Sequence, residues 1–180
     1  SNQKRICHRI RKKQDCNSWS FDWNYHWVYF GPLNSSAMNI LILQGPNLNL
    51  LGLKSSNKNE RLTLDKLNKS IRNHIKGNNV SLKFLQTHKQ FQAINFLQRN
   101  RTWADGLIII PTSWAKYDWS IVETINLIQL PTSIIFFEEP FSFGTTESES
   151  IMVGNSIKSF SDQPIKACSA GIDHLLSQMI

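Results

Sequence analysis

Short apolar runs alternate with amphipathic stretches from Met38 onward, a pattern typical of an α/β domain with a parallel sheet. Continuous apolar runs predict buried strands, whereas apolar residues spaced by three and four predict helices. The predicted strands are Asn39 to Leu43, Val80 to Leu85, Gly106 to Ile110, Ser133 to Phe137 and Ile165 to Cys168. The predicted helices are Thr63 to Lys76, Phe91 to Asn100, Ser120 to Leu130 and Ile172 to Met179. The simplest topology for this order is a flavodoxin-like three-layer sandwich with a five-stranded parallel sheet.

Three loops of this predicted fold are candidates for a ligand site. Open α/β sheets bind ligands beyond the carboxyl ends of their strands. The loops in question begin at Gly45, Pro111 and Glu138. Residues that bind a ligand or act in catalysis are therefore expected in these three loops.

Residues 1–37 differ in character from the rest and are taken as an extension, with residues 38–180 forming the domain. A basic run is followed by aromatic residues at every second position: Trp19, Phe21, Trp23, Tyr25, Trp27 and Tyr29. This alternation predicts one face of a strand, or stacking platforms beside an arm that binds RNA or a protein partner. The alternatives are a poorly ordered extension, an upstream sequence foreign to the native protein, or a cleaved organelle leader, which Asp15, Asp22 and the tryptophans disfavour.

Length and composition narrow the class of protein. The chain has 180 residues, 41% of them hydrophobic, enough for one domain with a continuous core. No apolar stretch approaches the roughly 18 residues of a membrane span. The three cysteines form no close pair, so a reducing compartment, cytoplasm or organelle matrix, is expected. Of the net charge of +7, residues 1–37 carry +4, and the remaining +3 is ordinary for a soluble domain.

The most distinctive motif follows the first predicted strand: Gly45-Pro46-Asn47-Leu48-Asn49-Leu50-Leu51-Gly52. Gly and Pro set a tight turn, and two short amides can bond either the loop itself or a ligand. From its residues alone, the motif is either a turn whose amides hydrogen-bond only within the loop or a turn that binds a ligand. The string closely resembles the opening of type II 3-dehydroquinate dehydratases, and the resemblance continues from Met38 to about Leu176.

That resemblance implies a fold, an assembly and a reaction. The family has a flavodoxin-like fold, assembles as a trimer-based dodecamer, and dehydrates 3-dehydroquinate in the shikimate pathway without metal or organic cofactor. A tyrosinate on a mobile lid removes a proton from substrate carbon, an arginine favours its ionised form, and a histidine protonates the departing hydroxyl. The cation is needed because a tyrosine pKa near 10 leaves the phenol protonated at neutral pH.

The chain departs from the family at the proton-abstracting step. The family's lid arginine falls on Lys54 and its tyrosine on Asn59, in a loop of the family's length. An asparagine amide has no accessible pKa as a base. Lys54 keeps a positive charge without the planar fork of arginine.

The next two loops depart in the same way. The family's Asn-Pro-Gly-Ala becomes Ile110-Pro111-Thr112-Ser113, its tyrosine becomes Trp114, and its histidine becomes Lys116. At the fourth strand, Ile134 and Phe136 replace the orienting glutamate and the general-acid histidine. Glu138 and Glu139 stand where a substrate carboxylate is held, and like charges at about 4 Å repel by roughly 4 kcal/mol at an effective dielectric of 20. Downstream, the family's two arginines fall near Phe143 and Glu147.

Few family positions are retained. Asn49 matches a residue of the family's catalytic site. Asn47, Lys54, Lys116 and Glu123 are the candidates for substrate binding, and Glu123 matches an aspartate that the family contributes across a subunit contact. Compared with the family, this chain keeps the residues of the opening turn and of the subunit contact, whereas the groups that transfer protons are replaced. His74, His88 and His174 are expected to be surface or helix residues.

Three hypotheses follow from this pattern. The first is a non-catalytic descendant that keeps the fold for assembly or binding, as a homo-oligomer or with a partner held by the basic arm. The second is a working dehydratase with a rearranged site, in which Tyr117 beside Lys116 is the base. The third is a small-anion binder that uses Lys54 and Lys116 near the Asn47 turn.

Overall fold

The computed structural model describes residues 19–21, 27–29, 37–56 and 61–178. The chain divides into two compact units, residues 1–35 and 36–180. In the first unit, β1 (Trp19–Phe21) pairs antiparallel with β2 (Trp27–Tyr29). The alternating aromatic run therefore contains two short strands, and the remainder of residues 1–36 lies outside the described residues. The use of this segment as a binding arm, an extension or a leader stays a prediction.

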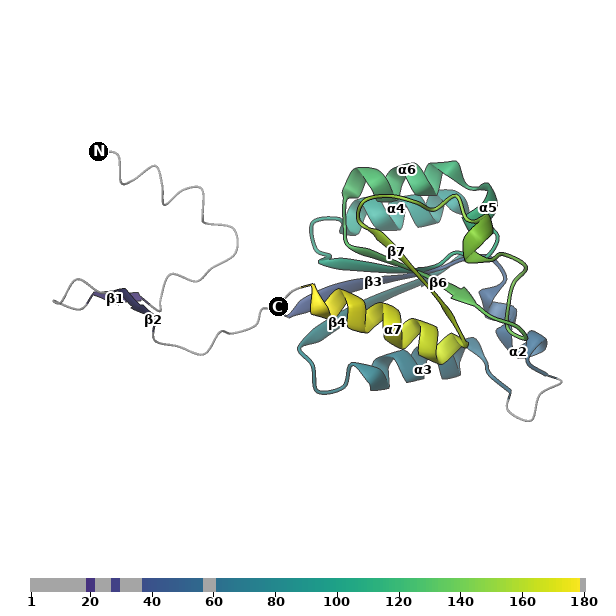
Figure 1. The fold of residues 1–180 in the computed structure, drawn as a ribbon, viewed down its shortest axis with the longest axis horizontal. Coiled ribbons are helices and arrows are strands. Elements are labelled where there is room, and N and C mark those ends of the chain that lie inside the picture. The colour runs from purple at the N-terminus through teal and green to yellow at the C-terminus, as the bar shows by residue number, and fades with distance from the viewer. Residues whose placement is uncertain (1–18, 22–26, 30–36, 57–60, 179–180) are drawn as a thin grey trace. The chain divides into compact units, whose positions relative to one another are not determined.

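The second unit is a parallel sheet between two layers of helices (Figure 1). Its strands follow the order β4-β3-β5-β6-β7, and every neighbouring pair is parallel. They are β3 (Met38–Gln44), β4 (Val80–Gln86), β5 (Gly106–Ile110), β6 (Thr132–Phe137) and β7 (Ile157–Asp162). The helices are η2 (Leu48–Leu50), α2 (Leu51–Lys54), α3 (Leu64–His74), α4 (Gln90–Asn100), α5 (Trp114–Tyr117), α6 (Trp119–Ile128), η3 (Glu147–Glu149) and α7 (Pro164–Ser177). The predicted three-layer sandwich with a five-stranded parallel sheet is confirmed.

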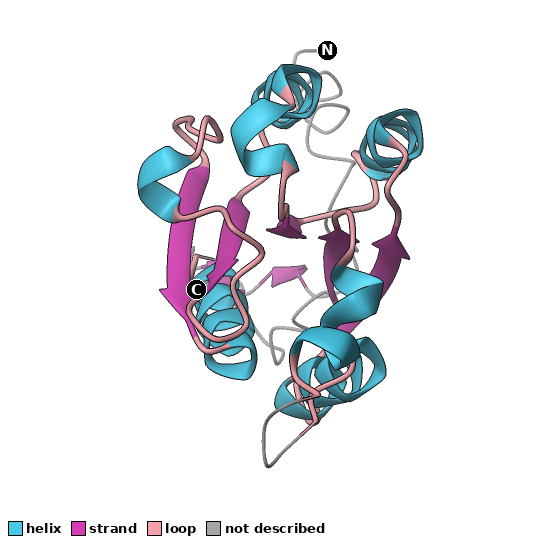
Figure 2. Cartoon of the chain, turned by 90° about the vertical axis from the view of Figure 1, so that its right-hand side faces the viewer, coloured by secondary structure: helices cyan, strands magenta, loops and turns pink. Residues whose placement is uncertain are grey.

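Successive side chains of the central strands point to opposite faces of the sheet and pack in two separate hydrophobic cores. One core lies against α3 and α7 and includes Ile42, Ile110 and Ile135. The other lies against α4 and α6 and includes Leu43, Ile134 and Phe136. Strands buried on both faces are continuous apolar runs because both sets of side chains must be apolar. Figure 2, which looks onto the carboxyl ends of the strands, shows the sheet between the two helical layers.

Helix α3 lies within the predicted helix Thr63 to Lys76 and ends two residues earlier, at His74. The Thr63 side chain accepts a hydrogen bond from the Lys66 N–H at 3.3 Å, an N-cap that satisfies one of the helix's unpaired donors. After the helix, Gly77 adopts φ 99, which favours glycine. Among the helices of the described residues, none has the length and apolar content to cross a membrane.

The prediction of a fifth strand at Ile165 to Cys168 is wrong. Those residues lie in α7, which starts at Pro164 rather than at Ile172 and ends at Ser177. Proline is favoured in the first turn of a helix because its missing N–H would have no partner there. The true fifth strand, β7, reads IKSFSD and was missed because an edge strand needs few apolar residues.

Candidate functional site

The first two loops at the carboxyl edge of the sheet are joined by main-chain contacts. The Gly45 N–H donates to the Ile110 carbonyl at 2.8 Å. A Cβ atom at Gly45 would lie 2.4 Å from the carbonyl oxygen of Pro111, closer than such atoms ever approach. Glycine is therefore required here by the neighbouring backbone. The glycine of the opening motif sets how closely the loop after β3 approaches the loop after β5.

Thr112 ties the same two loops together through its side chain. Its hydroxyl lies 2.8 Å from the Pro46 carbonyl oxygen and 2.7 Å from that of Pro111, and it donates to one of them at a time. Thr112 has φ 51, although β-branched residues rarely adopt this left-handed conformation. It stands where the family motif Asn-Pro-Gly-Ala has glycine. This chain thus has a left-handed residue at this position without the glycine to which that conformation costs least.

Thr112→Val is expected to lower the free energy of unfolding by about 1 kcal/mol, because the inter-loop hydrogen bond is lost while the left-handed strain remains. Thr112→Gly loses the same bond but relieves strain of about 1 to 2 kcal/mol, so it should be the more stable variant. Urea unfolding of the two variants measures this difference. A valine variant more stable than the glycine variant would contradict the assignment.

The retained asparagines of the opening turn lie at the surface. Asn47 has φ 63 and its carbonyl accepts the Leu50 N–H at 2.8 Å. The side chains of Asn47 and Asn49 are both exposed. Beneath the turn, buried Gln44 donates to the Asn68 side chain at 2.6 Å, and Gln86 donates to the Gly45 carbonyl at 3.3 Å. The turn is held by its own bonds, and its two amides face outward.

The positions that replace the family's polar groups are filled by the hydrophobic core. Ile134 is fully buried and Phe136 is 4% exposed, both in the core against α4 and α6 together with Trp114. Ile110 is 2% exposed in the core against α3 and α7. Side chains with no ionisable group are thus packed inside the protein. Asn59, at the lid position, lies outside the described residues.

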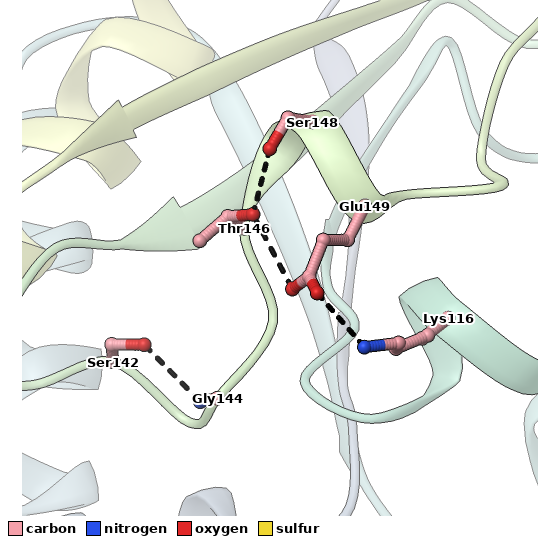
Figure 3. Close-up of polar contacts among 6 residues, drawn as sticks. All are labelled: Lys116, Ser142, Gly144, Thr146, Ser148 and Glu149. Carbon is pink, nitrogen blue, oxygen red and sulfur yellow. Dashed lines mark hydrogen bonds and ion pairs between the residues drawn. The ribbon is translucent and has the colours of Figure 1, made fainter.

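The loop after β6, residues 140–151, folds back onto α5. Its Glu149 carboxylate accepts a hydrogen bond from the Lys116 ammonium at 2.9 Å, and the Ile151 N–H donates to the Ala115 carbonyl at 2.8 Å. The hydrogen bond between Lys116 and Glu149 raises the pKa of the lysine and lowers the pKa of the carboxylate. Figure 3 shows the lysine directed at the carboxylate. One of the two candidate anion-binding cations is therefore already paired.

The other candidate cation also contacts the 140–151 loop. The Lys54 ammonium lies 5.5 Å from the ring centre of Phe143, within cation–π range. Thr146 bridges to the Ser148 hydroxyl at 3.0 Å and to Glu149 at 3.4 Å, and the Ser142 hydroxyl accepts the Gly144 N–H at 3.1 Å (Figure 3). Glu138 and Glu139, between β6 and this loop, are exposed. The loop is thus held both to the end of α2 and to α5.

The remaining candidate residues do not form an acid–base pair at the carboxyl edge of the sheet. Tyr117 is 73% exposed and Glu123 is exposed on α6. Asp118 is buried but serves structure, since it caps α6 by accepting the Ile121 N–H at 3.2 Å and accepts a bond from Gln90 at 2.7 Å. Among the described residues, no three His, Cys, Asp or Glu side chains are grouped to hold a metal ion.

The histidines have surface or structural surroundings, as predicted. His88 is exposed after β4. His74 contacts Asp173 at 2.7 Å, linking α3 to α7. Desolvation, with the nearby Lys158 charge, lowers the pKa of His174. Burial raises the pKa of Cys168 to about 12, so its thiol is not a nucleophile at neutral pH.

The comparisons with known proteins agree with one another. Residues 38–157 match the family model described as dehydroquinase class II. The chain is 31% identical over 109 residues to a 3-dehydroquinate dehydratase of Dictyoglomus turgidum, covering 58% of this chain and 75% of that protein. It is 28% identical over 93 residues to one of Clostridium botulinum, covering 52% of this chain and 63% of that protein. With a Sulfurovum relative, 30% identical, the match spans 59% of that protein. The chain thus spans about six tenths of two of these relatives.

Solved structures show the same fold. A type II dehydroquinase from Butyrivibrio crossotus superposes with a TM-score of 0.66 at 22% identity, covering 77% of this chain and 97% of that one. One from Propionibacterium acnes gives 0.63 at 17% identity, covering 79% and 98%. A 3-dehydroquinate dehydratase-like protein from Bifidobacterium longum gives 0.52 at 14% identity, covering 78% and 98%. The resemblance inferred from the opening motif is confirmed.

Proposed function

Because the chain belongs to the class II dehydroquinase family, we propose that it is a member that no longer dehydrates 3-dehydroquinate and uses the fold for binding or assembly. The observation that carries this proposal is the burial of Ile110, Ile134 and Phe136 in two apolar cores. Side chains packed in this way cannot orient a substrate or move a proton. General acid–base catalysis needs an ionisable group within hydrogen-bond reach of the substrate.

Electrostatics at the carboxyl edge supports the same proposal. Glu138 and Glu139 are exposed there, and each adds a negative charge that repels a carboxylate substrate. The nearby cations, Lys116 and Lys54, are engaged by Glu149 and by the Phe143 ring. A small-anion binder based on those two lysines would first have to release the 140–151 loop.

A rearranged but active dehydratase is the alternative. Tyr117 is its best base, since it follows Lys116 in sequence, but that lysine points at Glu149. With 73% of Tyr117 exposed, water screens the charges around its phenol. The family's trimer-based assembly, with Glu123 at a contact between copies, is a separate proposal that mass measurement of the intact particle would test.

A single-turnover assay tests the proposed loss of activity. The purified full chain, at a concentration equal to that of 3-dehydroquinate, should form 3-dehydroshikimate no faster than buffer does, as followed by the absorbance of the conjugated product. Turnover above this background that disappears in Tyr117→Phe would support the rearranged enzyme instead. Turnover unaffected by that substitution would overturn both assignments.

A further inference from the structure

The charge of the domain is strongly divided along the chain. Residues 38–104 contain eleven Lys or Arg and two Asp or Glu, whereas residues 105–180 contain three and nine. The formal charges of these halves are +9 and −6, which nearly cancel in the total for the domain. In the fold, the first half supplies β3, β4, α3 and α4, and β4 is the outer strand on that side of the sheet. The positive half therefore surrounds the β4 edge.

A row of cations runs along one face of α3. Lys66, Lys69 and Arg72 follow at intervals of three, Lys76 lies in the turn after the helix, and all four are exposed. Like charges at these spacings destabilise a helix. Lys66 also stands in the first turn, where the helix dipole disfavours a cation. Helix stability therefore does not account for this row.

Arg72 of this row and one further cation, Lys83, lie over aromatic rings next to β4. The Arg72 guanidinium lies 4.3 Å from the ring centre of Phe84, and the Lys83 ammonium lies 3.8 Å from that of Trp103. Lys83 also donates to Asn100 at the end of α4, at 3.0 Å. The row on α3 thus continues around the edge strand to the end of α4. We call this set the β4-edge band: Lys66, Lys69, Arg72, Lys83, Arg99 and Arg101.

Within the residues that the structure describes, no carboxylate forms an ion pair with a cation of the β4-edge band. Across the described part of the chain, the ion pairs are His74 with Asp173 and Lys116 with Glu149, and neither involves the band. The hydrogen bonds of Lys66, Arg72 and Arg101 go to main-chain carbonyls. The six side chains of the band are exposed, and none of the ion pairs of the described residues neutralises them.

The negative half of a second copy of this chain is poorly suited to bind the β4-edge band. Five of its nine carboxylates already have local bonds: Asp105 with the Asn39 N–H, Asp118 with the Ile121 N–H, Glu149 with Lys116, Asp162 with the Gln163 N–H and Asp173 with His74. A head-to-tail contact would have to break those bonds or use the few other carboxylates. An external polyanion meets no such competition.

We propose that the β4-edge band binds the phosphate backbone of a nucleic acid. Regularly spaced phosphates match a row of exposed cations, and binding is driven by release of the counterions that phosphates hold. Exposed amide side chains beside the band, including those of Asn73, Gln98 and Asn95, can bond phosphates and base edges. The negative half of the domain orients the polyanion toward the β4 edge. This site is independent of the proposed loss of dehydratase activity, which is read by a different assay.

The test compares two pairs of substitutions that change the net charge equally. Arg72→Gln with Lys83→Gln removes two cations from the band, and Lys158→Gln with Lys166→Gln removes two exposed cations from the other half. Like Lys83 and Arg72, Lys158 lies near an aromatic ring, 5.5 Å from Phe160. The full chain and both variants are titrated against labelled single-stranded RNA and duplex DNA by fluorescence anisotropy at several salt concentrations. Circular dichroism checks that each variant is folded.

The wild-type chain should bind at least one of the two nucleic acids, with affinity that falls as salt rises. For RNA, the band variant should weaken binding and reduce the slope of log affinity against log salt by about 1.4, that is about 0.7 for each lost phosphate contact. The control variant should match the wild type. A preference for RNA or for duplex DNA identifies which nucleic acid the site takes.

Several results would overturn the proposal. Equal losses in both variants would mean that only net charge matters. An unchanged band variant, with binding abolished by neutralising Arg9, Arg11, Lys12 and Lys13, would place the interaction in the N-terminal segment. Binding to acidic lipid vesicles without binding to RNA or DNA would indicate a membrane surface. Salt-sensitive self-association lost in the band variant, again without nucleic-acid binding, would indicate a second copy.

Discussion

Phe136→His, which restores the family's general-acid residue, is expected to destabilise the domain by about 3 kcal/mol and to restore no activity. Phe136 is 4% exposed and lies in the core against α4 and α6 with Ile134 and Trp114. An imidazole there would lose apolar contacts and bury polar nitrogens among apolar neighbours. Urea unfolding measures the loss, which should grow as pH falls below about 6.5, because the unfolded histidine can take a proton and the buried one resists it.

Phe136→Leu is the matched control, because it also reduces volume but adds no polar atom. Its cost should be smaller, about 1 kcal/mol, and independent of pH over the same range. A histidine variant as stable as the leucine variant would show that this position is not part of a closed core. Dehydratase activity in the histidine variant would show that the rest of the site is still intact.

Gly45→Ala is expected to cost about 3 kcal/mol, because the added methyl group would collide with main chain rather than with a side chain that can move. Its Cβ would lie 2.4 Å from the Pro111 oxygen and 2.8 Å from the Pro111 carbonyl carbon. The Gly45 N–H is bonded to the Ile110 carbonyl, so separating the loops would also weaken that bond. Urea unfolding again provides the measurement.

Gly106→Ala is the control for this substitution. It lies at the opposite end of β5, where a Cβ would meet the ends of the Leu175 and Met38 side chains at 3.1 and 3.4 Å. Those flexible groups can shift, so the cost should stay below about 1 kcal/mol. Similar costs at the two glycines would mean that the loops after β3 and β5 are not held together as described.

The sequence predicted those elements whose local pattern and packing agree. β5 is predicted to the residue, because a strand buried on both faces is a continuous apolar run ended by Pro111. Helix α3 starts one residue after the start of the predicted helix, because the Thr63 side chain caps it. The error at the carboxyl end arose because β7 is a polar edge strand, while the apolar residues of α7 include a short run that resembles a strand.

The candidate site could be predicted only in part. The resemblance located the replaced positions, and the apolar character of Ile134 and Phe136 predicted that they carry no proton chemistry. Contacts between distant residues had no signal in the sequence: Lys116 and Glu149 are 33 positions apart, and Thr112 reaches Pro46 across 66. The net charge of the domain did not reveal the separation of positive and negative residues, because it sums over both sides of the sheet.

Exchange of the acidic carbon-bound proton of 3-dehydroquinate with solvent shows whether the folded chain still has a catalytic base, since this step needs only a base and precedes loss of water. 3-Dehydroquinate is incubated in D₂O with the purified full chain at equal concentration, and the proton signal is followed by NMR against a buffer control. We predict exchange at the rate of the control and no 3-dehydroshikimate. Exchange faster than the control, abolished when the added chain is unfolded, would show that the folded protein still presents a base to the substrate and would contradict the account.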